Sequence, residues 1–418
     1  MSGSVGSGHP VSRPVEDGPA AGETPVGATA PASPRPAPAL PGSGSEGERL
    51  ARAALSRLAE PGDPRMAALV AELGATRVHR HLAEERDVGG VLTDVASRLQ
   101  EIRPERDLEQ AERRGIRFVV PGDAEWPVRL GDLDHCDQVQ DRGGSPLGLW
   151  VRGPLRLGDL VSPVAVVGSR SATTYGADVA GEIGAHLGGL GACVVSGAAF
   201  GIDQAAHRGA LAARGPTVAV LACGVDRAYP AAHKNLLDHI GGHGAIVSEL
   251  APGCSPTRLR FLSRNRVIAA LSVGTVIVEA AVRSGALNTA NWTDRLSRAL
   301  MGVPGPVTSA PSQGVHQLLR AGSATLVTRG AEVAELVGAA GDHLTTDERT
   351  PERSRDRLRP REAQVLDAVP VARPARADSI SRTAGIGLAE VQRLLGRLRD
   401  RGLVERGPAG WTLSDAAR

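Results

Sequence analysis

Short apolar runs alternate with helical stretches in the middle of the chain, between about residues 163 and 337. Five of these runs are rich in β-branched residues and are bounded by glycine or polar residues, as strands are. They read VAVVG, ACVVSG, TVAVLACG, AIVSE and GTVIVEA. This alternation is typical of βαβ units, which form a parallel sheet with helices on both faces. The pattern predicts a Rossmann-like, doubly wound, mostly parallel α/β domain over residues 151–340.

The segments before and after this domain have different patterns. Residues 1–46 consist mainly of Gly, Ser, Pro and Ala, and we expect a disordered tail because such a sequence can bury little apolar surface. Helical spacing of apolar residues from Glu48 onward predicts a small helical domain, and we expect this domain to be SAM-like and, with a connector, to span residues 47–150. Residues 341–357 are charged and lack apolar periodicity, so we interpret them as a linker.

The last segment, residues 358–418, predicts a winged-helix domain. Three helical stretches are followed by LVERGPAGWTLS, which alternates about a turn like a small hairpin. The third stretch has an apolar stripe at i, i+3, i+4 and i+7 from Val391. Its exposed arginines are candidates for contact with duplex DNA, namely Arg393, Arg397 and Arg401. A wing that mediates only protein contacts is equally compatible with the sequence.

Composition limits the class of protein. The 418 residues are 41% hydrophobic, and no apolar run is as long as a membrane span, so we expect two or three soluble domains and no membrane partner. Four scattered cysteines and the lack of a leader pattern indicate a reduced, cytoplasmic protein without a disulfide framework. The net charge of +2 does not by itself identify a nucleic-acid partner, because such binding depends on local basic patches.

Three loops at the expected carboxyl ends of strands carry the candidate binding chemistry, because ligands of doubly wound sheets bind there. They are GSRSATTYG (168–176), SGAAFGID (196–203) and EAAVRSGALNTA (279–290). Each contains small residues where backbone N–H groups can approach an anion. Arg170 adds a guanidinium that can bind one phosphate through two hydrogen bonds. Each glycine alone could simply make a tight turn, but three such loops together favour a site.

A basic stretch, TRLRFLSRNRVIAAL, places four arginines within nine residues around Phe261. Arginines beside an exposed ring can grip a single strand and stack its bases, although a solvated basic face is the alternative. Arg264 and Arg266 are two positions apart, so we do not expect them on one helix face. The candidate DNA- and phosphate-binding residues are Gly168, Ser169, Arg170, Ser196, Gly197, Phe200, Gly201, Phe261, Arg264, Asn265, Arg266, Ser284, Gly285 and Thr289.

Familiar nucleotide, metal and catalytic motifs do not match. The chain has neither GxGxxG after its first expected strand nor GxxxxGK[ST], and its histidines lack HExxH-type spacing, so we expect no cofactor, no metal and no catalytic residue. An enzymatic alternative comes from LSVGTVIVEAA, which is loosely similar to the PGGxGTxxE motif of phosphoribohydrolases that cleave nucleoside monophosphates. That enzyme would use Glu279, which could equally cap or orient neighbouring groups at a strand end.

From about residue 47 to the C-terminus the chain resembles the DNA-processing protein A (DprA, also called Smf) family. The resemblance is carried in order by GSR at 168–170, SGAAFGID at 196–203, RNRVIAALS at 264–272, SGALNTA at 284–290 and VPG at 303–305. It implies a non-catalytic protein whose Rossmann-like core binds single-stranded DNA and forms a homodimer. It also implies that the protein protects incoming strands during natural transformation and helps load the recombinase RecA.

Two departures from the family pattern lie in these loops. Phe200 stands where the family usually has arginine, which removes one potential phosphate contact and offers a stacking surface. Asn288 replaces a usual aliphatic residue. Both changes bear on DNA affinity and not on the fold. We expect single strands to bind more tightly than duplex, with weak dependence on base sequence and a steep dependence on salt.

Overall fold

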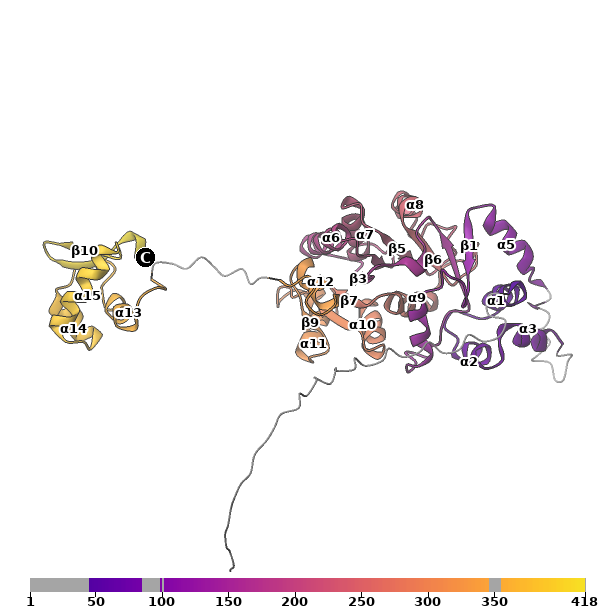
Figure 1. The fold of residues 1–418 in the computed structure, drawn as a ribbon, viewed down its shortest axis with the longest axis horizontal. Coiled ribbons are helices and arrows are strands. Elements are labelled where there is room, and N and C mark those ends of the chain that lie inside the picture. Colours follow the sequence, from indigo (N-terminus) through magenta and orange to yellow (C-terminus); the bar gives the residue numbers. More distant parts are fainter. Residues whose placement is uncertain (1–44, 85–97, 100, 346–354, 418) are drawn as a thin grey trace, which may run out of the picture.

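The computed structural model describes residues 45–84, 98–99, 101–345 and 355–417 (Figure 1). Residues 1–44 of the expected tail and residues 346–354 of the expected linker lie outside the described residues. Ser45 and Glu46 belong to the first helix and not to a tail, because Ser45 Oγ accepts the N–H of Glu48 at 3.3 Å and caps the helix that begins at Glu46.

Within the described residues, a nine-stranded sheet has the order β1-β2-β6-β5-β4-β3-β7-β8-β9 (Figure 1). Neighbouring strands from β6 to β9 are parallel, whereas β2 is antiparallel to both β1 and β6. The predicted mostly parallel α/β class is therefore confirmed. The strands are β1 (Ile116–Val119), β2 (Leu149–Arg152), β3 (Val164–Val167), β4 (Val194–Ser196), β5 (Thr217–Val220), β6 (Ala245–Ser248), β7 (Gly274–Ile277), β8 (Ala299–Gly302) and β9 (Thr325–Leu326).

Helices cover both faces of the sheet because alternate strand residues point to opposite sides. In β3, Ala165 and Val167 pack in a core with α9, α10 and α11, whereas Val164 and Val166 pack in a core with α6, α7 and α12. Both faces are buried, as the near-continuous apolar strands require. The helices are α6 (Thr174–Gly189), α7 (Ile202–Ala212), α8 (Lys234–His243), α9 (Arg258–Leu271), α10 (Ala286–Arg295), α11 (Gln313–Arg320) and α12 (Gly330–Val337).

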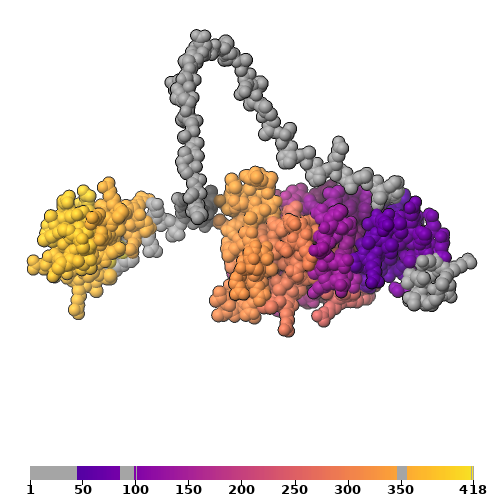
Figure 2. Space-filling view, turned by 90° about the horizontal axis from the view of Figure 1, so that it is seen from below, coloured from indigo at the N-terminus to yellow at the C-terminus, as the bar shows by residue number. Residues whose placement is uncertain are grey.

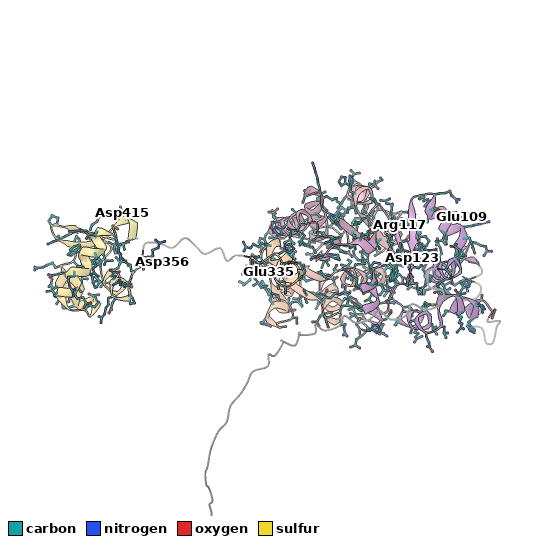
Figure 3. All side chains as sticks on the ribbon, in the orientation of Figure 1. Glu109, Arg117, Asp123, Glu335, Asp356 and Asp415 are labelled. Carbon is teal, nitrogen blue, oxygen red and sulfur yellow. The ribbon has the colours of Figure 1, made fainter. Side chains whose placement is uncertain are left out.

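The described helices before the sheet are α1 (Glu46–Leu58), α2 (Pro64–Leu73), α3 (Ala75–Glu84) and α5 (Pro104–Glu112). Figure 2 shows the N-terminal part, in indigo, directly against the magenta part of the chain. One contact between them is the ion pair of Arg49 with Asp123, at 2.7 Å, just after β1 (Asp123 is labelled in Figure 3). The strands β1 and β2 extend the sheet into the segment expected as a connector, across residue 150. The division into domains stays a prediction.

The C-terminal residues fold as α13 (Pro360–Asp367), α14 (Ala377–Ala384), α15 (Leu388–Asp400) and an antiparallel hairpin of β10 (Val404–Gly407) and β11 (Gly410–Leu413). The predicted stripe of α15 is buried, and Trp411 of the hairpin belongs to the same core. Three helices followed by a hairpin form the winged-helix architecture expected from the sequence.

No helix in the described parts of the chain is long and apolar enough to cross a membrane. The four cysteines are free, and Cys193 and Cys223 are buried.

Candidate nucleic-acid interface

A groove lies where the order of the parallel strands reverses, between β3 and β7. On one side of this point β3 is followed by β4, β5 and β6, and on the other side β7 is followed by β8 and β9. The groove has a volume of about 950 Å³ and is lined by the loops after β3 and β7, by α9 and by the start of α10. A topological switch point of this kind is where open α/β sheets bind their ligands.

The structure brings most of the sequence-predicted residues together at this groove. Nine of the fourteen candidates line it: Gly168, Ser169, Arg170, Phe261, Arg264, Asn265, Ser284, Gly285 and Thr289. The other five lie elsewhere: Ser196, Gly197, Phe200, Gly201 and Arg266. Whether any of the fourteen contacts DNA stays a prediction.

A cation and two aromatic rings are stacked at one side of the groove. The guanidinium carbon of Arg170 lies 4.6 Å from the centre of the Phe261 ring, and the Tyr229 ring lies 5.6 Å from it. Arg170 is exposed and Tyr229 is 43% exposed, so both can reach a ligand in the groove. The contact with the Phe261 ring helps to hold the exposed Arg170 side chain in place. These three side chains combine a guanidinium that can donate hydrogen bonds to a phosphate with two rings on which a base can stack.

The groove is strongly positive. Arg170, Arg258 and Arg283 line it, are exposed, and have no ion-pair partner among the described residues. Asp203 is the acidic residue among the described lining residues, and it is buried. Sequence reasoning did not place Arg258 and Arg283 among the site residues, although both lie within stretches it had singled out. Arg258 and Arg283 are candidates because they are exposed in the groove, and their exposure depends on packing that cannot be deduced from the sequence.

Arg264 lines the groove from beneath. Its guanidinium is buried and donates to Val220 O at 3.0 Å. Burial lowers the pKa of this guanidinium to about 10, and the nearby Asp203 carboxylate acts in the opposite direction. Arg264 therefore supplies positive charge below the groove and supports its wall, while the exposed arginines are better placed to bind phosphate directly.

In the loop of residues 196–203, two of the N–H groups that could face an anion bind a carboxylate of the protein itself. Its N–H groups from Gly197 and Ala199 donate to Asp203 Oδ2 at 3.2 and 3.4 Å, and Ser196 Oγ donates to Val166 O at 2.7 Å. Gly201 has φ +76° and approaches Ser169 O so closely that a Cβ would lie 2.3 Å from that oxygen. An internal carboxylate therefore occupies two of the loop's N–H groups, and phosphate binding by this loop stays a prediction.

Gly197 makes room for Arg264, which leads to a prediction. A Cβ at position 197 would lie 1.4 Å from Arg264 Nη1, so Gly197→Ala must displace the guanidinium. We expect a loss of about 1–3 kcal/mol in the free energy of unfolding, as for overpacked cores. Urea unfolding measures it. The matched control is Gly285→Ala, which meets no atom within 4 Å and has negative φ. Equal stability of the two variants would contradict this account.

Phe200 lies outside the groove lining. Its ring is 45% exposed and packs edge-on against His233, with ring centres 4.5 Å apart. The His233 ring is itself buried, and its Nδ1 lies 2.9 Å from Ala198 O. Phe200 is therefore partly exposed, and the buried His233 ring packs against it and supports it. A role in stacking DNA stays a prediction.

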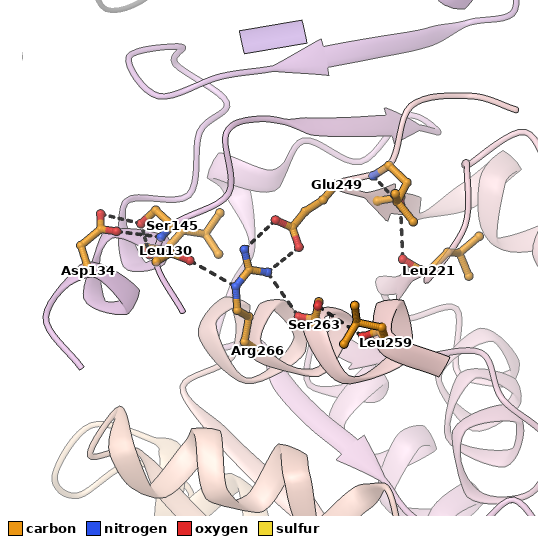
Figure 4. A network of polar contacts seen from close by, with 11 residues as sticks. Leu130, Asp134, Ser145, Leu221, Glu249, Leu259, Ser263 and Arg266 are labelled. Atoms are coloured by element: carbon orange, nitrogen blue, oxygen red, sulfur yellow. Dashed lines mark hydrogen bonds and ion pairs between the residues drawn. The ribbon is translucent and has the colours of Figure 1, made fainter. Parts of the chain in front are cut away.

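Arg266 was predicted as a phosphate contact, but the structure directs its side chain into the protein. Figure 4 shows its guanidinium between α9 and the segment after β6, where it binds both oxygens of Glu249 and also donates to Gly144 O at 3.2 Å. The Arg266 side chain is 1% exposed and that of Glu249 is 9% exposed. The two-residue spacing directs Arg264 and Arg266 to different sides of α9, and Arg266 faces inward.

Glu279 acts as a helix cap. Its carboxylate accepts the N–H of Thr173 at 2.9 Å and the hydroxyl of Thr173 at 2.6 Å, at the start of α6. It is 2% exposed, and its carboxyl carbon would lie 2.4 Å from a Cβ at Gly176. The geometry favours the capping interpretation of Glu279 over a catalytic one, because its oxygens are engaged and enclosed.

In the winged helix, two of the three candidate arginines have an internal partner. Arg401 and Arg397 lie 3.1 and 3.9 Å from the buried carboxylate of Glu362 on α13. A backbone hydrogen bond at Arg359, with these cations nearby, lowers the pKa of Glu362 despite its burial. Arg393 is exposed on α15 and makes no ion pair with the described residues. All three arginines are exposed, and contact with duplex DNA stays a prediction.

Among the described residues, no group of three or more His, Cys, Asp or Glu side chains is placed to hold a metal ion.

Comparison with known proteins gives consistent results. Residues 117–338 match the family model described as DNA recombination-mediator protein A. A curated DprA relative of Mycobacterium tuberculosis is 45% identical over 368 residues, which cover 86% of this chain and 92% of the relative. The DNA processing protein DprA of Streptococcus pneumoniae is 41% identical over 209 residues, covering 48% of this chain and 71% of the relative. The X-ray structure of DNA processing protein A from Streptococcus pneumoniae aligns with a TM-score of 0.54 at 29% identity, covering 69% of this chain and 96% of that one.

Proposed function

Since this chain belongs to the DNA recombination-mediator protein A family, we propose that its groove binds single-stranded DNA. One observation carries the proposal: the groove at the switch point combines three exposed arginines with the partly exposed rings of Phe261 and Tyr229. Proteins that bind single strands combine a positive groove along the backbone with aromatic surfaces on which bases stack.

The same features favour a single strand over a duplex. Arginine side chains bind the phosphates of either form, but a ring can stack on a base only when that base is free of its neighbours. The affinity for single strands should therefore exceed the affinity for duplex and depend weakly on base sequence. It should fall steeply as the salt concentration rises, because each bound phosphate releases counterions.

We propose further that the protein works in the cytoplasm, as a non-catalytic recombination mediator. In this role it protects incoming single strands during natural transformation and helps to load the recombinase RecA. The proposed mediator role rests on the family to which the chain belongs and on the groove. DNA bound in the groove would stay single-stranded, which is the form that a recombinase binds.

The proposal is tested by a gel shift with a random-sequence single-stranded oligonucleotide, run beside an incubation of the protein with nucleoside monophosphates. We expect a shift with the single strand, a weaker one with blunt duplex, and no release of free base. Base release without a shift would replace the proposal with the phosphoribohydrolase alternative. Equal binding of both DNA forms would contradict the preference for single strands.

The proposed homodimer gives a second prediction. Because the family resemblance implies dimerisation through the Rossmann-like domain, the intact chain should sediment as a dimer at micromolar concentration. Removal of residues 341–418 should leave that state unchanged, since the winged helix is not the proposed contact. Sedimentation equilibrium decides it, and a monomer in both forms would contradict the proposed assembly.

Phe200 gives a third prediction. Phe200→Arg places a cation on an exposed site beside the groove loops, where the family usually has arginine. We expect tighter binding of single strands and a slope of log K against log salt steeper by about 0.7, the value for one added phosphate contact. Fluorescence anisotropy at several salt concentrations measures both. An unchanged slope would show that DNA does not pass over residue 200.

A further inference from the structure

Three side-chain amides form a connected row along the groove: Asn265 on α9, Asn288 on α10, and Gln140 on a turn before β2. Asn265 Nδ2 donates to Asn288 Oδ1 at 3.2 Å, and Asn288 Nδ2 donates to Gln140 Oε1 at 3.2 Å. The three residues come from distant parts of the sequence, and all of them line the groove. The row therefore forms part of the surface that a bound strand meets.

The row ends in unused hydrogen-bonding atoms. Asn265 Nδ2 uses both of its hydrogens, because it also donates to Gly285 O at 3.2 Å. No donor among the described residues contacts Asn265 Oδ1, and no acceptor among them contacts Gln140 Nε2. Asn265 is only 6% exposed and Asn288 only 7%. Neither Asn265 Oδ1 nor Gln140 Nε2 is enclosed by the protein, and both residues line the groove, so a ligand bound there can reach both atoms.

The backbone places Gln140 in a two-residue hairpin turn. Gln140 and Asp141 have φ of 52° and 58°, and Val139 pairs with Arg142 across them. Two successive positive φ values are uncommon outside glycine and cost conformational energy. Here the hydrogen bond from Asn288 holds the Gln140 side chain at the edge of the groove.

We propose that this amide row seats the hydrogen-bonding edge of one unstacked nucleobase of the bound single strand, an inference that rests on the proposed function. Asn265 Oδ1 accepts an N–H of the base, and Gln140 Nε2 donates to a ring nitrogen or carbonyl oxygen of the base. A phosphate diester has no N–H to give, so an unpaired acceptor in the groove favours a base over a phosphate. Unstacked bases are commonly bound through these edges.

The seat does not require one base sequence. Every DNA base offers both a donor and an acceptor on its Watson–Crick edge, so each can fill the row in some orientation. This agrees with the weak dependence on sequence expected of the groove. Asn288, which joins the two ends of the row, is also the residue where this chain departs from the usual aliphatic residue of its family.

The test compares two fluorescent strands of equal length, one with normal bases and one with an abasic sugar at every position. Wild-type protein should bind the normal strand more tightly in anisotropy titrations. Asn288→Leu, which keeps the size of the side chain, should weaken binding of the normal strand about three- to tenfold, the effect of one or two hydrogen bonds. It should leave the affinity for the abasic strand unchanged. Equal loss for both strands, or no loss, would overturn the proposal.

Two further variants make the result specific. Asn235→Leu is the matched control, because Asn235 is exposed on α8 and lies outside the groove lining. It should leave both affinities unchanged, and a loss as large as that of Asn288→Leu would contradict the assignment to the amide row. Gln140→Gly removes one end of the row at an exposed turn and suits its positive φ, so it should reproduce the selective loss even if Asn288→Leu folds poorly. If Gln140→Gly leaves the affinity for the normal strand unchanged, the proposal is overturned.

The outcome for wild-type protein separates this proposal from the one on which it rests. Failure to bind either strand would overturn the proposed function itself. Tight and equal binding of the normal and abasic strands would leave single-strand binding in place and overturn both the base seat and the stacking of bases on Phe261 and Tyr229. A preference for the normal strand that Asn288→Leu and Gln140→Gly both retain in full would overturn the base seat alone.

Discussion

Arg266→Met is expected to lower the free energy of unfolding by about 3–5 kcal/mol, the largest stability effect that we predict. Arg266 is fully buried and binds both carboxylate oxygens of Glu249, so its removal leaves a buried carboxylate without its counter-ion. Urea unfolding measures the change. The same substitution at Arg295, whose pair with Asp137 is exposed, serves as the matched control and should cost less than about 1 kcal/mol.

The partner variant distinguishes a lost ion pair from lost packing. Arg266→Met combined with Glu249→Leu removes both charges, and apolar replacements of buried pairs are often neutral or stabilising. We therefore expect the double variant to be more stable than Arg266→Met alone. If the second substitution adds a further loss of similar size, the ion pair is not what holds α9 to the segment after β6.

Arg170→Ala is expected to weaken single-strand binding by about 1.5–3 kcal/mol, or roughly ten- to 150-fold. Arg170 is exposed, is held over the Phe261 ring at 4.6 Å, and can make two parallel hydrogen bonds to one phosphate. The melting temperature should not change, since the side chain covers little of the core.

Arg170→Lys should recover only part of the affinity, because an ammonium group cannot reproduce the planar pair of hydrogen bonds. Arg77→Ala is a control on the exposed side of α3, outside the groove lining, and should bind as wild type does. Fluorescence anisotropy at constant salt compares the four proteins. Wild-type affinity in Arg170→Ala would remove this residue from the interface.

The core of the fold could be predicted because its signal is local. The five β-branched runs all form strands, since parallel strands buried on both faces are continuously apolar. The strands that the sequence did not reveal, β2, β8 and β9, are short or lie at or near the edges of the sheet, and β9 has only two residues. Their pairing depends on distant partners, as in β2 with β6.

The candidate site was predictable in its location and less so in its individual contacts. The loops after β3 and β7 line the groove because the topology places them there. The loop after β4 has the same glycine-rich appearance, but its N–H groups bind Asp203, a contact that composition does not reveal. Helix geometry predicts that Arg266 and Arg264 point in different directions. It does not predict the partner of Arg266, because Glu249 lies on another element of the fold.

The central claim, that the groove at the switch point binds the backbone of a single strand, is tested most directly by the salt dependence of binding. The measurement is the slope of log K against log salt for wild-type protein and for Arg170→Ala/Arg258→Ala/Arg283→Ala, which removes the three exposed arginines of the groove. Each lost phosphate contact should reduce the slope by about 0.7, so we predict a reduction of about 2 with an unchanged melting temperature. An unchanged slope in a folded triple variant would contradict the account and would mean that DNA binds elsewhere on the chain.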